Sequence, residues 1–168
     1  VFIDSEPVDL ATCTFRDYVR ELDMQHSVLR RSFTLVASDG AEFAFAVERF
    51  LSYAQPDLAA IRYSVTARTR PAEIRFEPFL NGDVRNEDAN YGDKFWEFVS
   101  STADPQAFAV TMRTCKTRFS VSAAAAWQLN GTAPRSIDAF TEREGELQGV
   151  SVTALAQQHV GAQVVMVA

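Results

Sequence analysis

The sequence has few of the residues on which nucleophilic and metal-dependent catalysis usually depends. Its 168 residues include only two cysteines, Cys13 and Cys115, and two histidines, His26 and His159. These residues do not have zinc-ligand spacing, and no Gly-x-Ser-x-Gly motif supplies a hydrolase nucleophile. We expect both histidines to lie at the surface or at a strand edge, without a catalytic role. We expect the cysteines to be reduced and buried, with a disulfide between them as the alternative for a secreted parent protein.

Glycine and positive charge are also sparse. The seven glycines never cluster into a phosphate-binding loop, and 16 basic residues scattered among 22 acidic ones give a net charge of −6. A nucleic-acid partner is therefore not expected, because the basic residues form no cluster that could bind a phosphate backbone. No apolar run approaches the roughly 20 residues that span a bilayer, and the first residues do not resemble a signal peptide. We expect a cytoplasmic protein without a membrane partner.

The sequence is rich in phenylalanine, and its apolar residues alternate with polar ones. The strongest hairpin pattern is Asp39-Gly40, which separates alternating apolar residues at 33–37 from others at 43–47. The alternation returns at 59–65, 74–76, 108–112, 119–127, 150–154 and 164–167, with turn residues between these stretches. Residues 5–18 and 136–143 could be argued as helices, but neither has a sustained apolar stripe. The predicted fold is all-β, an antiparallel sandwich.

The alternation fails for about twenty residues between Asn81 and Asp104, which is long for a loop in a compact domain and therefore suggests function. Paired carboxylates can cleave glycosides, and acidic residues recur along this stretch. Adjacent acids in a polar loop are more often simply solvated. The candidates for a catalytic acid are Glu87, Asp88, Asp93 and Glu97.

The same stretch partly matches a calcium-binding loop. Asn86, Asp88, Asn90 and Glu97 occupy its first, third, fifth and twelfth positions. The sixth position, where the sharp turn needs glycine, holds Tyr91. We therefore expect no metal site here.

Aromatic rings and amides also gather in this stretch, and that mixture suits sugars, whose C–H faces pack on rings while their hydroxyls form hydrogen bonds. The alternative is a loop that packs its aromatics on its own sandwich or on a neighbouring domain. We predict a loop that contacts either substrate or an interface, with these residues: Asn86, Glu87, Asp88, Asn90, Tyr91, Lys94, Phe95 and Trp96.

The segment NGDVRNEDANYGDKFWEF at 81–98 resembles the N-terminal domain of glycoside hydrolase family 65. In that family a turn with glycine and aspartate leads into an Asn-Glu-Asp run and a Phe-Trp pair. Residues 21–40, 47–66 and 144–167 resemble further strands of the same domain, so the resemblance covers nearly the whole chain. The Asn-Glu-Asp run is most similar to the maltose phosphorylases among the family's members.

The resemblance implies a super-sandwich of antiparallel strands attached, in the intact enzyme, to an (α/α)6 barrel. The parent would convert maltose and inorganic phosphate to β-glucose 1-phosphate and glucose with inversion, with phosphate as co-substrate and no cofactor. A carboxylic acid on the barrel would protonate the glycosidic oxygen while phosphate attacks. No residue of this chain matches the barrel, so no catalytic residue is assigned to it.

We therefore expect residues 1–168 to form a single N-terminal sandwich domain, truncated at both ends and inactive alone. Its expected partners are its own catalytic barrel, the disaccharide and a second subunit of a homodimer. The competing interpretation is a stand-alone carbohydrate-binding or structural sandwich. The sequence leaves the disaccharide linkage open.

Overall fold

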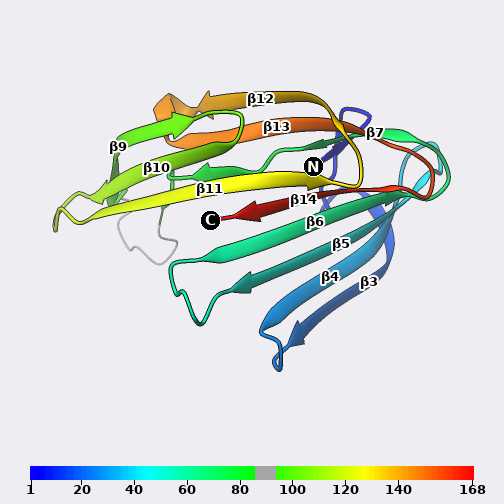
Figure 1. Ribbon diagram of the computed structural model, residues 1–168, viewed down its shortest axis with the longest axis horizontal. Coiled ribbons are helices and arrows are strands. Elements are labelled where there is room, and N and C mark those ends of the chain that lie inside the picture. The colour runs from blue at the N-terminus through cyan, green and yellow to red at the C-terminus, as the bar shows by residue number, and fades with distance from the viewer. Residues whose placement is uncertain (86–93) are drawn as a thin grey trace. The chain divides into compact units, whose positions relative to one another are not determined.

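A computed structural model describes residues 1–85 and 94–168, and these residues are almost entirely β-structure (Figure 1). The two segments considered as possible helices form strands instead. Residues 5–18 contain β2 and the start of β3, and residues 136–143 contain most of β12, so the all-β prediction is confirmed. No helix in the described ranges is long and apolar enough to cross a membrane. In chain order the described elements are β1 (Phe2–Ile3), β2 (Glu6–Pro7), β3 (Thr14–Asp23), β4 (Val28–Val36), β5 (Glu42–Leu51), β6 (Ala59–Ala67), β7 (Ala72–Phe76), β8 (Phe79–Asn81), β9 (Trp96–Ala103), β10 (Ala107–Thr114), β11 (Ser120–Asn130), β12 (Pro134–Glu142), the 3-10 turn η1 (Arg143–Gly145), β13 (Leu147–Ala156) and β14 (Gly161–Val167).

The predicted hairpin at Asp39-Gly40 joins β4 to β5. Gly40 has a φ of +80°, a backbone conformation that glycine adopts without strain. The Asp39 side chain accepts a hydrogen bond of 2.9 Å from the Ala41 N–H, which stabilises the turn. The register places Phe33 opposite Phe45, so the alternating apolar residues of both strands face the same side.

The described chain divides into two compact units. Unit 1 consists of residues 1–76, 127–136 and 152–168, and unit 2 of residues 77–126 and 137–151. Strands β11, β12 and β13 each contribute residues to both units. Whether the two units act as one domain, as the sequence predicts, stays a prediction.

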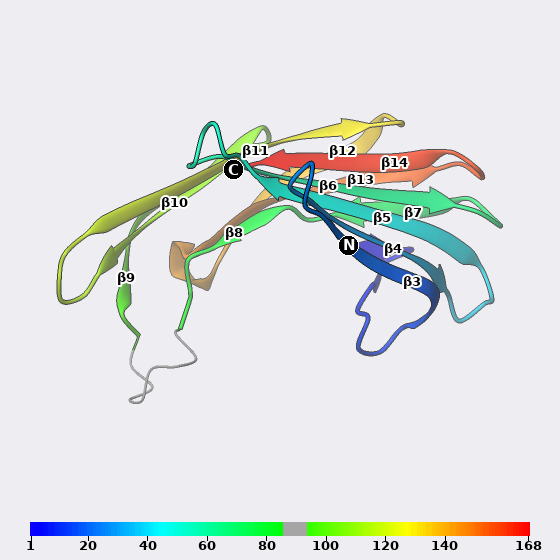
Figure 2. The same cartoon turned by 90° about the horizontal axis from the view of Figure 1, so that it is seen from below.

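Unit 1 has two antiparallel layers. In the larger layer the strand order is β3-β4-β5-β6-β14, followed by β11, and Figures 1 and 2 show β3 to β6 side by side. In the smaller layer the order is β2-β1-β7, followed by residues Val152–Ala156 of β13, which pair with β7.

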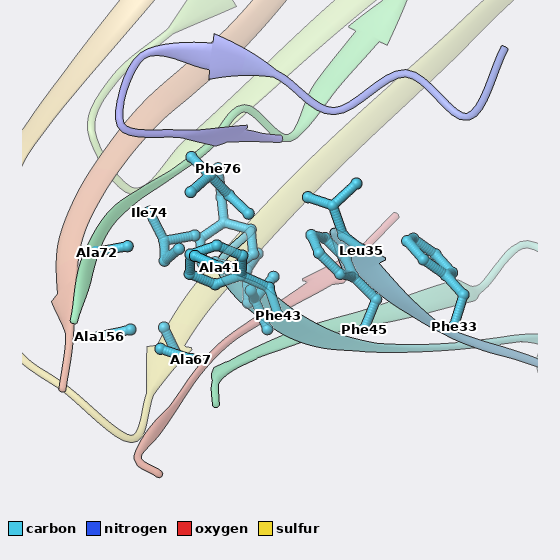
Figure 3. Packing of buried hydrophobic residues seen from close by; sticks show 14 residues of the cluster. Phe33, Leu35, Ala41, Phe43, Phe45, Ala67, Ala72, Ile74, Phe76 and Ala156 are labelled. Carbon is cyan, nitrogen blue, oxygen red and sulfur yellow. The ribbon is translucent and has the colours of Figure 1, made fainter. Parts of the chain in front are cut away.

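The core of unit 1 is an apolar cluster that joins its two layers (Figure 3). Phe33 and Phe45 stack with ring centroids 4.7 Å apart, while Ile74 and Phe76 come from β7. Burying each such large apolar side chain stabilises the fold by about 1.5–3 kcal/mol. The cluster therefore supplies most of the stabilisation of unit 1. The buried members are Ile3, Phe33, Leu35, Ala41, Phe43, Phe45, Val65, Ala67, Ala72, Ile74, Phe76, Ala156, Ala162 and Val164.

Unit 2 contains β8, β9, β10 and the neighbouring parts of β11, β12 and β13. Its apolar residues alternate along β10, where Phe108, Val110 and Met112 are buried. Gly82 lies against β10, and a Cβ added there would stand 2.7 Å from the Met112 sulfur. Only glycine therefore fits at this position without displacing the methionine side chain.

A polar side chain, Gln148, is buried in unit 2 with 1% exposure. Its Nε2 donates to the Gly145 carbonyl at 2.8 Å and to the Ser101 hydroxyl at 3.0 Å. Its Oε1 accepts a hydrogen bond of 2.8 Å from the Thr141 hydroxyl. Burial of this amide is therefore compensated by three hydrogen bonds.

Candidate functional site

Only some of the predicted loop residues lie within the described ranges. Lys94, Phe95 and Trp96 are described, and all three are partly buried. The other predicted loop residues and three of the candidate catalytic acids lie outside the described residues: Asn86, Glu87, Asp88, Asn90, Tyr91 and Asp93. The described part of the site consists of residues that flank positions 86–93.

Lys94 joins the two flanks of this segment through ion pairs. Its Nζ lies 3.2 Å from Asp83 Oδ1 and also donates a hydrogen bond to the carboxylate of Glu146, which immediately precedes β13. Arg143 Nη1 lies 3.0 Å from the other oxygen of Asp83. We call Asp83, Lys94, Arg143 and Glu146 the Lys94 cluster. It links residues on both sides of 86–93 to the start of β13.

The central side chains of the Lys94 cluster are partly shielded from water, and their ion pairs favour the charged forms. The Lys94 and Glu146 side chains are 26% and 16% exposed. The hydrogen bond to Glu146 raises the pKa of Lys94 above its ordinary value, and a second bond to Asp83 contributes in the same direction. The hydrogen bond from Lys94 lowers the pKa of Asp83. These groups stay charged near neutral pH, which suits structural ion pairing and not proton transfer.

Trp96 opens β9 beside the Lys94 cluster, and its indole lines a surface groove of about 240 Å³. This volume is below the roughly 300–1,000 Å³ of typical small-molecule pockets, so it could hold part of a sugar or one inserted side chain. The residues that line the groove are Asn81, Gly82, Val84, Trp96, Val110, Met112, Val121 and Ala123.

Phe95 lies between Lys94 and Trp96 and fixes the chain through its backbone. Its carbonyl accepts a hydrogen bond of 2.8 Å from the Cys115 N–H. The Cys115 thiol lies 3.6 Å from the Lys94 carbonyl. The segment after position 93 is thus tied to the turn between β10 and β11.

Glu97, the one candidate acid within the described residues, forms ion pairs with two arginines. Its carboxylate lies 2.7 Å from Arg113 Nε and 2.5 Å from Arg118 Nη1. The hydrogen bond from Arg113 lowers the pKa of Glu97. A carboxylate that stays ionised in this way is a poor proton donor at neutral pH, so Glu97 does not suit the role of a catalytic acid. The described residues contain no group of three or more His, Cys, Asp or Glu side chains that could hold a metal ion.

The cysteine prediction is partly wrong. Both thiols are free, but Cys115 is exposed because it occupies the turn that follows β10. Cys13 is partly buried and packs against the core of unit 1.

The two histidines lie at the surface, in turns. His26 stands between β3 and β4 and is bonded to Asp23 at 2.8 Å, and His159 lies between β13 and β14. The prediction of surface positions is confirmed.

The sequence analysis missed Arg143 and Glu146 and gave Asp83 no role of its own. Arg143 is 60 residues from Asp83 in the chain, and a charged residue beside a turn gives no indication of a distant partner. The one available signal was the pairing of an aspartate with the Gly82 turn, since such turns often fix the end of a loop.

Comparisons with known proteins agree with this architecture. Residues 1–166 match the family model described as "Glycosyl hydrolase family 65, N-terminal domain". Maltose phosphorylase of Bacillus subtilis (strain 168) is 34% identical over 136 residues, which cover 78% of this chain and 18% of that protein. A solved structure named "Putative kojibiose phosphorylase from human microbiome" superposes with a TM-score of 0.82 and 16% identity over 99% of this chain and 20% of that chain.

These matches differ in what they establish. The structural likeness at 16% identity shows the sandwich fold alone. The chain spans about a fifth of the length of the proteins it matches. Because the family model matches nearly every residue, the chain belongs to glycoside hydrolase family 65 as its N-terminal domain.

Proposed function

We propose that this chain is the N-terminal sandwich of a disaccharide phosphorylase that converts maltose and inorganic phosphate to β-glucose 1-phosphate and glucose with inversion. The observation that carries the proposal is its 34% identity to a maltose phosphorylase over 136 residues. We place the chemistry in a separate (α/α)6 barrel, as membership of the family implies, and the carboxylates of Glu97 and Glu146 near the candidate site are ion-paired. The parent needs phosphate as co-substrate and no cofactor, and it works in the cytoplasm as a homodimer.

We assign the sandwich a supporting role. The loop at 83–98 contacts the sugar site, the barrel or the second subunit, and the Lys94 cluster fixes both ends of that loop. The half-buried Trp96 supplies an aromatic surface beside it. Buried aromatic anchors of this kind typically contribute more than about 1 kcal/mol to binding.

The reaction can be tested with two proteins. The purified 168-residue chain, incubated with maltose and phosphate, should form no glucose 1-phosphate, whereas the complete gene product should form it. Product formation by the 168-residue chain alone would disprove the separation of sandwich and chemistry. A complete gene product that binds maltose without phosphorolysis would favour a carbohydrate-binding module instead.

The role of the segment is tested by substitution in the complete protein. Asn90→Ala and Trp96→Ala should each weaken maltose binding or the dimer by at least ~1 kcal/mol, measured from KM and from sedimentation. Lys94→Met should produce the same kind of change by releasing the flanks. The matched control is Lys116→Met, because Lys116 is the chain's second lysine and is exposed in a turn. The control should keep the wild-type kinetics and mass, and if the three test variants also keep them, the segment has no such role.

A further inference from the structure

The larger layer of unit 1 carries an unusual group of arginines on its core-facing side. Arg31 precedes Phe33 by two residues in β4, and Arg49 follows the buried Val47 by two residues in β5. Because side chains in a strand alternate between faces, both arginines share the face of the apolar core. Arg20 of β3 lies directly opposite Arg31. Together these three residues line a surface cavity of about 160 Å³.

This arrangement concentrates positive charge that the described residues do not neutralise. Like charges directly opposite each other on neighbouring strands destabilise a sheet. Arg31 donates a long hydrogen bond of 3.4 Å to the Tyr63 hydroxyl, and its guanidinium carbon lies 5.9 Å from the centre of the Phe33 ring. No carboxylate among the described residues forms an ion pair with Arg20, Arg31 or Arg49.

The opposite face of the same strands shows that the sheet can balance its charges. There Arg30 lies 2.7 Å from Asp23 and 3.3 Å from Glu48, and Arg62 lies 2.9 Å from the same glutamate. The two faces carry similar numbers of arginines, but only the outer face supplies acids for them. The unpaired set is therefore confined to one face.

An apolar groove continues from the arginine cavity toward the strand ends. It has a volume of about 650 Å³ and shares Leu29 and Arg49 with that cavity. Its aliphatic rim is open to solvent, with Leu22 62% and Leu51 75% exposed. Exposed apolar surface beside fixed charges is typical of sites that bind a protein partner. We call the cavity and the groove together the arginine groove.

We propose that the arginine groove binds a polypeptide segment that carries one or two carboxylates beside aliphatic or aromatic side chains. The carboxylates pair with Arg20, Arg31 and Arg49 and remove their mutual repulsion, and the apolar side chains cover the groove next to Leu29. A small inorganic anion would leave the apolar groove uncovered. Nucleic acid is disfavoured by the net charge of −6. This role is separate from the segment at 81–98, which belongs to unit 2.

The experiment is a selection of phage-displayed random peptides on the immobilised 168-residue chain. Selected peptides should be enriched in Asp or Glu next to Leu, Ile or Phe. Binding of the enriched peptides, measured by fluorescence anisotropy, should weaken at least about tenfold in the Arg31→Gln and Arg49→Gln variants. The matched control is Arg135→Gln, which changes an exposed arginine outside the groove and should leave affinity unchanged. Thermal melts of each variant confirm that it is folded.

The remaining outcomes contradict the proposal. A selection that yields no binders, peptides without acidic residues, or peptides whose affinity is unchanged in both groove variants would each overturn it. Sedimentation of the free chain adds a further check. Dimers that disappear in Arg31→Gln would identify a second copy as the occupant and replace the proposed partner.

Discussion

The interiors of the two units are built differently. Unit 1 buries aromatic and aliphatic side chains from both its layers around Phe43, and its charged groups lie outside that cluster. Unit 2 buries fewer large apolar residues and places a fully bonded amide, Gln148, among them. Apolar burial depends on shape and volume, whereas a buried amide depends on the positions of specific partners. Unit 2 also holds the Lys94 cluster, so fixed polar geometry is concentrated in the unit that carries the candidate site.

The largest effect is expected from opening the apolar cluster. Phe43→Ala removes a fully buried ring and should lower the free energy of unfolding by about 3–5 kcal/mol, because a cavity replaces it. Urea denaturation followed by fluorescence measures this loss. Phe119→Ala, at a ring that is 70% exposed, is the control and should change stability by less than about 0.5 kcal/mol. Equal losses in the two variants would contradict the assignment of the core.

A smaller effect is expected from the buried amide of unit 2. Gln148→Met keeps the volume but leaves the Gly145 carbonyl without its donor, which should cost about 1–3 kcal/mol. The same denaturation experiment reports it. Gln106→Met, at an exposed position in the same unit, is the control and should be nearly neutral. A gain in stability for Gln148→Met would show that unit 2 prefers an apolar interior, as unit 1 does.

The smallest effect is expected from surface charge in unit 1. The hydrogen bond from Arg30, supported by bonds from His26, lowers the pKa of Asp23 well below its ordinary range. A lowered carboxyl pKa stabilises the fold above about pH 4 and loses this contribution as the pH falls further. The melting temperature of Asp23→Asn should therefore lie below that of the wild type at pH 7, and the gap should narrow below pH 4.

The control for this pH dependence is Asp57→Asn, which changes an exposed aspartate in the turn before β6. Its difference from the wild type should stay constant between pH 7 and pH 3. A gap for Asp23→Asn that widens as the pH falls would have the wrong sign and would rule out the ionised Asp23 as a stabilising group.

The strands could be predicted where one face is buried. At β4, β5, β6 and β10 the apolar residues alternate because one face of each strand packs on a core, and the turn at Asp39-Gly40 fixes the register. The edge strand β3 gave a weaker pattern, since most of its residues are exposed and burial does not select their type. The same reasoning explains β12, whose residues are mostly exposed.

The candidate site was less predictable than the fold. The aromatic and amide composition around Trp96 identified the segment, but it could not indicate that Lys94 pairs with Glu146, which is 52 residues away. Ion pairs depend on tertiary proximity and leave no periodic pattern in the sequence. The prediction that Cys115 is buried was wrong for a different reason. Cysteine generally prefers buried positions, but the position of Cys115 in a tight turn exposes it.

The core of unit 1 has a consequence for synthesis on the ribosome. Ile3 and Val164 belong to the same buried cluster although nearly the whole chain separates them. The strands of unit 1 that are made first therefore emerge with their apolar face uncovered, and they wait for β14 before the cluster can close. Folds with such distant contacts form slowly. We expect nascent chains that stop before Gly161 to associate with chaperones, while chains that include β14 lose this association.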